Sequence, residues 1–203
     1  MLFRSVTEEG ANDVNAMLAA CNPAPRMVIA ATPNNPTGAL LSEGALAKLI
    51  AGVPETTLLV IDEAYYELGR LAGGPDVLKA LKARKAPWLV LRTFSKAYNL
   101  AGLRVGYALA SHDELTEGIN RVRGVFNVNR VAQAAALAAL SDEPYAKASQ
   151  KKTAAERDRL AVGLKAMGLS PLPSAANFVA VKTPKPGTEV VGALARQGIM
   201  IVP

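Results

Sequence analysis

A lysine, two hydroxyl groups and an arginine lie within one short segment of this sequence, RTFSKAYNLAGLRVGY, at residues 92–107. Lys96 follows an apolar run, and its amine becomes a nucleophile if its surroundings remove the proton. Thr93 and Ser95 flank it, and Arg104 lies eight residues further on. Two hydroxyls with a guanidinium indicate a phosphate site, because a guanidinium binds phosphate through two parallel hydrogen bonds. Taken alone, Lys96 fits an ordinary surface lysine better than a nucleophile.

A carboxylate ends the apolar run LLVID, at Asp62. A charge at the end of such a run is costly unless a partner neutralises it, and a protonated ring nitrogen is a suitable partner. An aspartate that keeps a pyridine ring protonated allows the ring to accept electrons from a substrate carbanion. Tyr65 could donate its phenol to an oxygen of the same ring. Taken alone, Asp62 also fits a helix-capping or loop aspartate, and Tyr65 also fits an ordinary interfacial tyrosine.

The segment ATPNNPTG contains two prolines and a glycine that fix a rigid turn. Such a turn could present the Asn35 amide to the same ring oxygen, although a structural turn explains the segment equally well. Taken together, an amide, an acid with a phenol, and an amine with a guanidinium match different edges of one molecule. Each group supplies the charge that a different edge of pyridoxal phosphate, a flat ring that carries a phosphate, would require.

The elements that position these side chains alternate between strand and helix. We expect strands at 28–32, 58–61, 88–91 and 105–110, and helices at 42–51 and 75–84. Ser42 is placed to cap the first helix. Short continuous apolar runs separated by helical segments are typical of buried parallel strands. Ligands bind at the carboxyl ends of such strands, and the polar residues follow three of them.

After Ser111 the pattern changes to longer helical segments, which we place at 111–123, 131–140, 143–167 and 187–197. Pro144 is tolerated in the first turn of the third helix, and Leu194 marks the buried side of the fourth. Strands are expected at 177–181 and 199–202. The pattern predicts a separate α/β unit that begins near residue 125–145.

The segments PNNPTG, VIDEAYYE and RTFSKAYNLAGLRVGY closely resemble the fold-type I aminotransferases of class I/II, and within them the histidinol-phosphate aminotransferase branch. The similarity continues through FNVNRVAQAAALAAL and PSAANFVAV, so it covers nearly the whole chain. The resemblance implies an α/β fold with a mainly parallel sheet and flanking helices. It assigns residues 1–125 to a partial cofactor-binding large domain and residues 126–203 to part of a small C-terminal domain.

The resemblance also implies a role for each site residue. Lys96 would bind pyridoxal 5'-phosphate covalently and later move the substrate proton. Asp62 would pair with the ring nitrogen, while Asn35 and Tyr65 would contact the ring hydroxyl. The cofactor phosphate would be held by Thr93, Ser95 and Arg104. The amino group would move between glutamate/2-oxoglutarate and histidinol phosphate/imidazole-acetol phosphate, in histidine biosynthesis.

The family pattern extends beyond both ends of this sequence. Parts that the family places before Met1 include phosphate-binding amides, an aromatic residue that stacks on the ring, and residues that reach a neighbouring subunit. A substrate-binding arginine follows Pro203 in the family, and the branch often has arginine where Val202 stands here. Asn99 replaces a usual glycine. We therefore expect little or no transaminase activity from these residues alone, and an active homodimer from a longer protein.

Composition limits the other possible functions. The net charge is +6, but the basic residues are scattered and interleaved with acids, and no aromatic residues alternate with them, which argues against nucleic acid binding. The apolar runs are too short for a membrane span of about 20 residues, and no export signal opens the chain. One cysteine and one histidine exclude an internal disulfide and a Cys/His zinc cluster, so no metal is expected. This pattern fits the cytoplasm.

Three alternatives remain open. An aromatic-amino-acid aminotransferase shares the scaffold, and a threonine-phosphate decarboxylase would use Lys96 and Asp62 to break a different bond. A non-catalytic remnant would serve as a structural or interaction module. A nucleotide-binding domain is the weakest alternative, because neither a Gly-x-Gly-x-x-Gly segment after a strand nor a P-loop is present.

Overall fold

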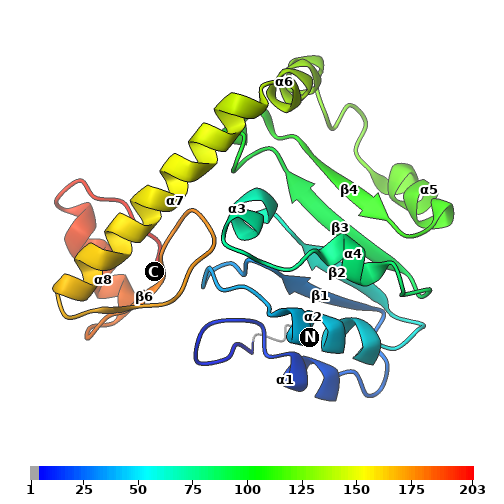
Figure 1. Ribbon diagram of the computed structural model, residues 1–203, viewed down its shortest axis with the longest axis horizontal. Coiled ribbons are helices and arrows are strands. Elements are labelled where there is room, and N and C mark those ends of the chain that lie inside the picture. The colour runs from blue at the N-terminus through cyan, green and yellow to red at the C-terminus, as the bar shows by residue number, and fades with distance from the viewer. Residues whose placement is uncertain (1–4) are drawn as a thin grey trace.

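The computed structural model describes residues 5–203, and its central element is a sheet with the strand order β1-β2-β3-β4 (Figure 1). The strands are β1 (Met27–Ala31), β2 (Leu58–Asp62), β3 (Trp88–Thr93) and β4 (Gly106–Ala110). The first three are parallel, as predicted. The parallel prediction was wrong for β4, which runs antiparallel to β3. The segment between them holds only the 3-10 helix η1 (Ala101–Leu103), whereas a parallel return needs a crossover, usually an α-helix.

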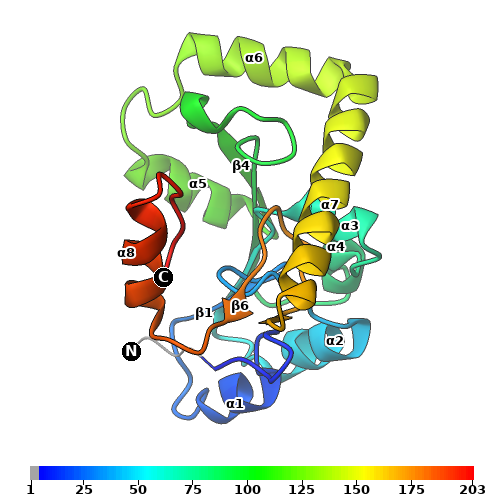
Figure 2. The same cartoon turned by 90° about the vertical axis from the view of Figure 1, so that its left-hand side faces the viewer.

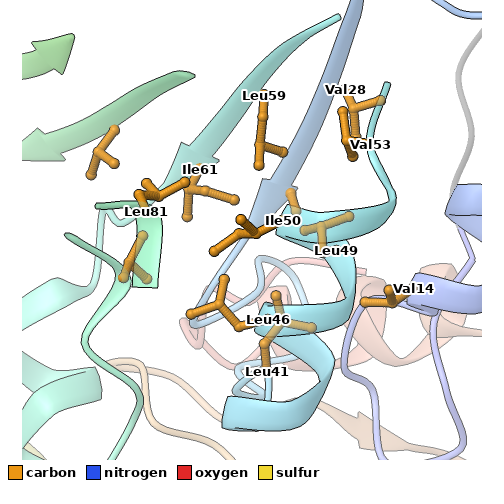
Figure 3. Close-up of a cluster of buried hydrophobic side chains, with 13 residues drawn as sticks. Val14, Val28, Leu41, Leu46, Leu49, Ile50, Val53, Leu59, Ile61 and Leu81 are labelled. Atoms are coloured by element: carbon orange, nitrogen blue, oxygen red, sulfur yellow. The ribbon is translucent and has the colours of Figure 1, made fainter. Parts of the chain in front are cut away.

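Helices cover one face of the sheet. Buried side chains of α1 (Val14–Ala19), α2 (Glu43–Gly52) and α4 (Val77–Leu81) pack against the strands in one cluster (Figure 3). On the opposite face of β1, Met27 and Ile29 are exposed. Val60 of β2 lies on the same face as Ile29 and is buried, so within residues 5–203 this face is open along β1 and covered at Val60.

The helix boundaries follow local capping. Ser42 accepts a hydrogen bond from the Ala45 amide at 3.1 Å, so the predicted cap of α2 is confirmed. Asp76 caps α4 in the same way, and this helix is shorter than predicted. The prediction missed α1 and α3 (Tyr66–Leu71), because helices of six residues are too short to show an apolar period.

The second half of the chain is mostly helical. It contains α5 (Asp113–Val122), α6 (Arg130–Ser141), the long α7 (Glu143–Ala166) and α8 (Gly187–Ala195) (Figure 2). The predicted bounds of α7 hold to within one residue at its end, and Leu194 of α8 is half-buried. A second sheet pairs β5 (Ser170–Pro171) with β6 (Val181–Lys182).

Two predicted strands were wrong or too long. The strand expected at 177–181 is reduced to β6, which has only a two-residue partner. Residues 199–202 form no strand and are exposed. A strand needs a neighbour to accept its hydrogen bonds, and the described part of the chain offers none at this place.

Two further classes of site can be assessed over residues 5–203. No helix in this range is long and apolar enough to cross a membrane. The same residues contain no group of three or more histidine, cysteine, aspartate or glutamate side chains that could hold a metal ion.

Candidate active site

The carboxyl ends of the three parallel strands line up at one rim of the sheet. Ala31 lies beside Asp62, and Asp62 lies beside Leu91. Because successive side chains of a strand point to opposite faces, Asp62 and Thr93 point to the same face as Ile29. Both residues are partly exposed at the rim, so they and the residues that follow the strands can contact a ligand there.

The turn after β1 gives its two asparagines different roles. Asn34 is buried, and its side-chain amide donates to Thr37 Oγ1 at 2.8 Å, which closes the turn. Gly38 follows with a φ of +85°, a conformation that favours glycine. Asn35 is exposed instead, and its Nδ2 donates to Tyr65 Oη at 3.2 Å. This hydrogen bond joins the turn after β1 to the segment after β2.

Tyr65 brings together residues from three parts of the chain. Its ring is buried, and Lys96 Nζ lies 5.4 Å from the ring centroid, within the range of a cation–π interaction. Phe178 meets the same ring edge-on, with the centroids 5.5 Å apart. No carboxylate of residues 5–203 is ion-paired with Lys96. Its amine is therefore not neutralised by an acid of this part of the chain.

The Asp62 carboxylate is held at one oxygen. Its Oδ1 accepts a hydrogen bond from the Ala64 amide at 2.8 Å, and the residue is half-buried. Its Oδ2 accepts no hydrogen bond from residues 5–203. This geometry orients the carboxylate and leaves an oxygen for a cationic partner such as a protonated ring nitrogen.

The hydroxyls and the guanidinium predicted as a phosphate site do meet. Thr93 Oγ1 lies 2.9 Å from Ser95 Oγ, and the Ser95 amide donates to Thr93 Oγ1 at 3.1 Å. Arg104 Nη1 donates to Ser95 Oγ at 3.4 Å. The backbone of Arg104 is left-handed, with φ of 55°, and so is that of Asn99, with φ of 58°. Asparagine tolerates this conformation better than most residues, which explains how it replaces a glycine.

An ion pair behind this rim was not anticipated from the sequence. On the covered face, Arg92 Nε and Nη2 both donate to Glu63 Oε2, at 2.9 and 2.7 Å. The Arg92 guanidinium also stacks 3.4 Å above the Tyr66 ring. The sequence did contain a signal for this pair: Glu63 and Arg92 carry opposite charges at the ends of apolar strands, directly after Asp62 and directly before Thr93.

Burial shifts the titration of the acids around this pair. Burial raises the pKa of Glu63, and the charge and hydrogen bonds of Arg92 offset part of that rise. Burial is the largest single influence on the pKa of Arg92 and would lower it, but the charges and hydrogen bonds of Glu63 and Tyr107 together outweigh burial, so the pKa is raised. Burial also raises the pKa of Glu67, and the Arg92 charge again opposes the rise.

Six of the seven predicted site residues are joined by contacts, in two groups. Asn35, Tyr65 and Lys96 form one group, and Thr93, Ser95 and Arg104 form the other. Asp62 is placed on the same rim by the strand register. The donor set fits a phosphorylated pyridine ring: hydroxyls and a guanidinium for the phosphate, a free carboxylate oxygen for the ring nitrogen, and an amine for covalent attachment.

Comparison with known proteins finds similarity along nearly the whole chain. The family described as Aminotransferase class I and II matches residues 3–203. Histidinol-phosphate aminotransferase 2 of Carboxydothermus hydrogenoformans is 45% identical over 190 residues, which are 93% of this chain and 52% of that protein. The protein of the same name from Pseudomonas aeruginosa is 46% identical over 192 residues, 95% of this chain and 52% of its own. The chain thus spans about half the length of the curated relatives it matches.

Solved structures show the same likeness. The histidinol-phosphate aminotransferase from Sinorhizobium meliloti, in complex with pyridoxal-5'-phosphate, superposes with a TM-score of 0.88 at 36% identity, over 98% of this chain and 55% of that one. The aspartate aminotransferase from Thermus thermophilus with maleate has a TM-score of 0.77 at 26% identity, over 97% of this chain and 53% of that one. The expected fold class is confirmed.

Proposed function

Because this chain belongs to the class I and II aminotransferases, we propose that it forms part of a pyridoxal-phosphate-dependent transaminase acting on histidinol phosphate and glutamate. Relatives 40–46% identical to it carry the name histidinol-phosphate aminotransferase. The observation that carries the proposal is the meeting of Asn35, Tyr65 and Lys96 beside the hydroxyl–guanidinium group of Ser95 and Arg104.

The proposed cofactor contacts follow from the donors and acceptors at the rim. When bound, pyridoxal phosphate supplies an electron-accepting ring that stabilises negative charge on a substrate carbon. Asp62 Oδ2 would accept a hydrogen bond from the ring nitrogen. Asn35 and Tyr65, whose polar atoms already lie within hydrogen-bond distance, would both donate to the ring hydroxyl. The phosphate would be bound by Thr93, Ser95 and Arg104.

Lys96 has two tasks in this proposal. Its amine would hold the cofactor covalently before the substrate arrives, and the freed amine would then move a proton from the substrate Cα. The Tyr65 ring, 5.4 Å from Nζ, would limit where the amine can lie during this transfer.

The substrate pair proposed is glutamate/2-oxoglutarate with histidinol phosphate/imidazole-acetol phosphate. One observation favours a second candidate, an aromatic-amino-acid aminotransferase. Val202 stands where the histidinol-phosphate branch often has an arginine, and its side chain is exposed and apolar. An apolar residue at this place suits an aromatic side chain better than a phosphate.

The test uses a longer protein that contains these residues, supplies it with pyridoxal phosphate and 2-oxoglutarate, and compares histidinol phosphate with phenylalanine as amino donors. We expect glutamate to form with histidinol phosphate at the higher kcat/KM. Faster formation from phenylalanine would favour the second candidate, and the absence of glutamate formation from either donor in that longer protein would contradict the proposal. Val202→Arg tests the determinant directly, because an added guanidinium should favour the phosphorylated donor.

We also propose the division into a large domain at 1–125 and a small domain at 126–203, a cytoplasmic location, and a homodimer for a longer protein. Exposed apolar side chains support an association: Val122, Val125 and Phe126 lie between 83 and 92% exposed. Sedimentation of the purified protein measures the oligomeric state. That these residues alone turn over little substrate stays a prediction, and the glutamate assay on the 203-residue chain checks it.

A further inference from the structure

Arg92 is connected to three residues of the candidate site. Its guanidinium contacts the sequence neighbours of two of them, and Arg92 itself is the sequence neighbour of the third. It donates twice to Glu63, the residue after Asp62. It stacks on Tyr66, the residue after Tyr65. Arg92 in turn directly precedes Thr93. One side chain on the covered face thus touches the neighbours of the acid and the phenol, and adjoins the first hydroxyl of the phosphate group.

The geometry points to Arg92, together with Glu63, as a positioning pair for the cofactor site. This inference deepens the proposed function and rests on it. The pair fixes the distance between the ends of β2 and β3, and so between the carboxylate that meets the ring nitrogen and the hydroxyls that meet the phosphate. Neither residue touches the cofactor, because successive residues of a strand point to opposite faces of the sheet.

The burial of the pair makes the link rigid. The side chains of Arg92 and Glu63 are 9% and 3% exposed, so water does not replace their hydrogen bonds. A planar guanidinium fits a carboxylate and an aromatic face at the same time, and a lysine ammonium does not. The backbone adds one further connection, because the Glu63 amide donates to Leu91 O at 2.9 Å. Rotation of either strand end is therefore opposed by two kinds of contact.

Two local hydrogen bonds report on the site side of this link. The Ala64 amide donates to Asp62 Oδ1 at 2.8 Å, and the Ser95 amide donates to Thr93 Oγ1 at 3.1 Å. If the pair holds both strand ends, removing it should free both amides, although neither touches Arg92. A role confined to general stability would not single out these two amides.

A matched control is available at the other end of the sheet. Arg84 is also partly buried, and its guanidinium donates to four backbone carbonyls, those of Ile50, Val53, Pro54 and Thr57. It lies before β3, near the start of β2, and contacts none of the site residues. Arg84→Met should therefore lower the stability of the chain without changing the site.

The experiment compares Arg92→Met, Arg92→Lys and Arg84→Met with the unchanged protein. Hydrogen exchange is measured at the Ala64 and Ser95 amides, and the Kd of pyridoxal phosphate is measured by fluorescence titration. We expect Arg92→Met to speed exchange at both amides and to raise the Kd by about tenfold or more, since small displacements in a site cost this much. Arg92→Lys should show smaller increases in the exchange rates and in the Kd, and Arg84→Met should change neither quantity.

These measurements can contradict the positioning role of Arg92 and Glu63 in two ways. The inference would be overturned if, in Arg92→Met, both the exchange rates of the two amides and the Kd of pyridoxal phosphate stay within about twofold of their values in the unchanged protein. Equal changes in Arg84→Met would also overturn it, because the effect would then be general instability. If Arg92→Met does not fold, Arg92→Lys decides by the same criteria. If the unchanged protein does not bind pyridoxal phosphate, the proposed function fails on that result, and the exchange data alone decide on the positioning pair.

Discussion

At the scale of single residues, each proposed cofactor contact has a neighbour that holds it. The Ala64 amide orients Asp62, the Tyr65 hydroxyl accepts from Asn35, and the Ser95 amide donates to Thr93. Such support keeps a site near its working geometry before the ligand binds, which lowers the entropy lost on binding. The sequence could suggest the residue types, but not these local hydrogen bonds.

The Tyr65 hydroxyl can be tested by Tyr65→Phe. This change keeps the ring that contacts Phe178 and removes the oxygen that contacts Asn35. We expect the affinity for pyridoxal phosphate to fall by about 1 kcal/mol, the value of one hydrogen bond, with the Tm nearly unchanged. Fluorescence titration and thermal unfolding measure the two quantities. An unchanged affinity would remove Tyr65 from the proposed contacts.

Glu67 gives a pH dependence of stability. Burial raises its pKa in the folded chain, so the folded state binds this proton more tightly than the unfolded state. The resulting stabilisation is present below the unfolded pKa and is lost as the pH rises through the raised folded pKa. Glu67→Gln should therefore raise the Tm at neutral pH and flatten its decline with pH just above the ordinary glutamate range.

Thermal unfolding between acidic and neutral pH checks this prediction. Glu8→Gln is the matched control, because Glu8 is exposed and the same change there removes only a surface charge. A Tm of Glu67→Gln below that of the unchanged protein at neutral pH would show that the Glu67 charge is stabilising instead.

At the scale of elements, the sequence was most informative where a local signal marks the boundary. The Ser42 cap and the Pro144 first turn placed the starts of α2 and α7, and the apolar runs placed β1, β2 and β3. Strand direction was less predictable. An apolar run at 105–110 looks the same in either direction, and only the lack of a crossover helix before it decides that β4 is antiparallel.

Pairing partners set the other limit of prediction. Residues 199–202 have the composition of a strand, but no described strand lies beside them to accept their hydrogen bonds. The Glu63–Arg92 pair is also a product of pairing, since only the register of β2 and β3 brings two residues 29 positions apart into contact. Composition alone could not reveal either result.

The connection between α2 and β2 depends on Arg84. Its four hydrogen bonds to backbone carbonyls end α2 and fix the approach to β2. Arg84→Met leaves buried carbonyls without donors, so we expect the free energy of unfolding to fall by about 2–4 kcal/mol. Urea unfolding measures this loss. A change below about 0.5 kcal/mol would mean that water satisfies the carbonyls.

At the scale of the whole molecule, the C-terminal half contacts the turn that carries Asn35. The Ala175 amide donates to Gly38 O at 2.8 Å, and Phe178 packs on Tyr65. A side chain at Gly38 would meet Ser174, with its Cβ at 2.6 Å from the added carbon. The segment 174–178 therefore brings the second half of the chain to the candidate site.

Gly38→Ala tests this contact, with Gly73→Ala as the control. Both glycines have positive φ, +85° and +80°, but only Gly38 has neighbours where the new methyl would lie. Both changes should cost about 1 kcal/mol of backbone strain. Only Gly38→Ala should also speed hydrogen exchange at the Ala175 amide and lower the affinity for pyridoxal phosphate. Equal effects of the two substitutions would contradict a specific contact.

Covalent labelling identifies the lysine that binds pyridoxal phosphate. The purified protein is mixed with pyridoxal phosphate, reduced with borohydride, digested and examined by mass spectrometry, alongside Lys96→Ala as the control. We expect a phosphopyridoxyl group on Lys96, and none on the remaining lysines of Lys96→Ala under the same conditions. A label on another lysine, or the same amount of label in Lys96→Ala, would contradict this expectation.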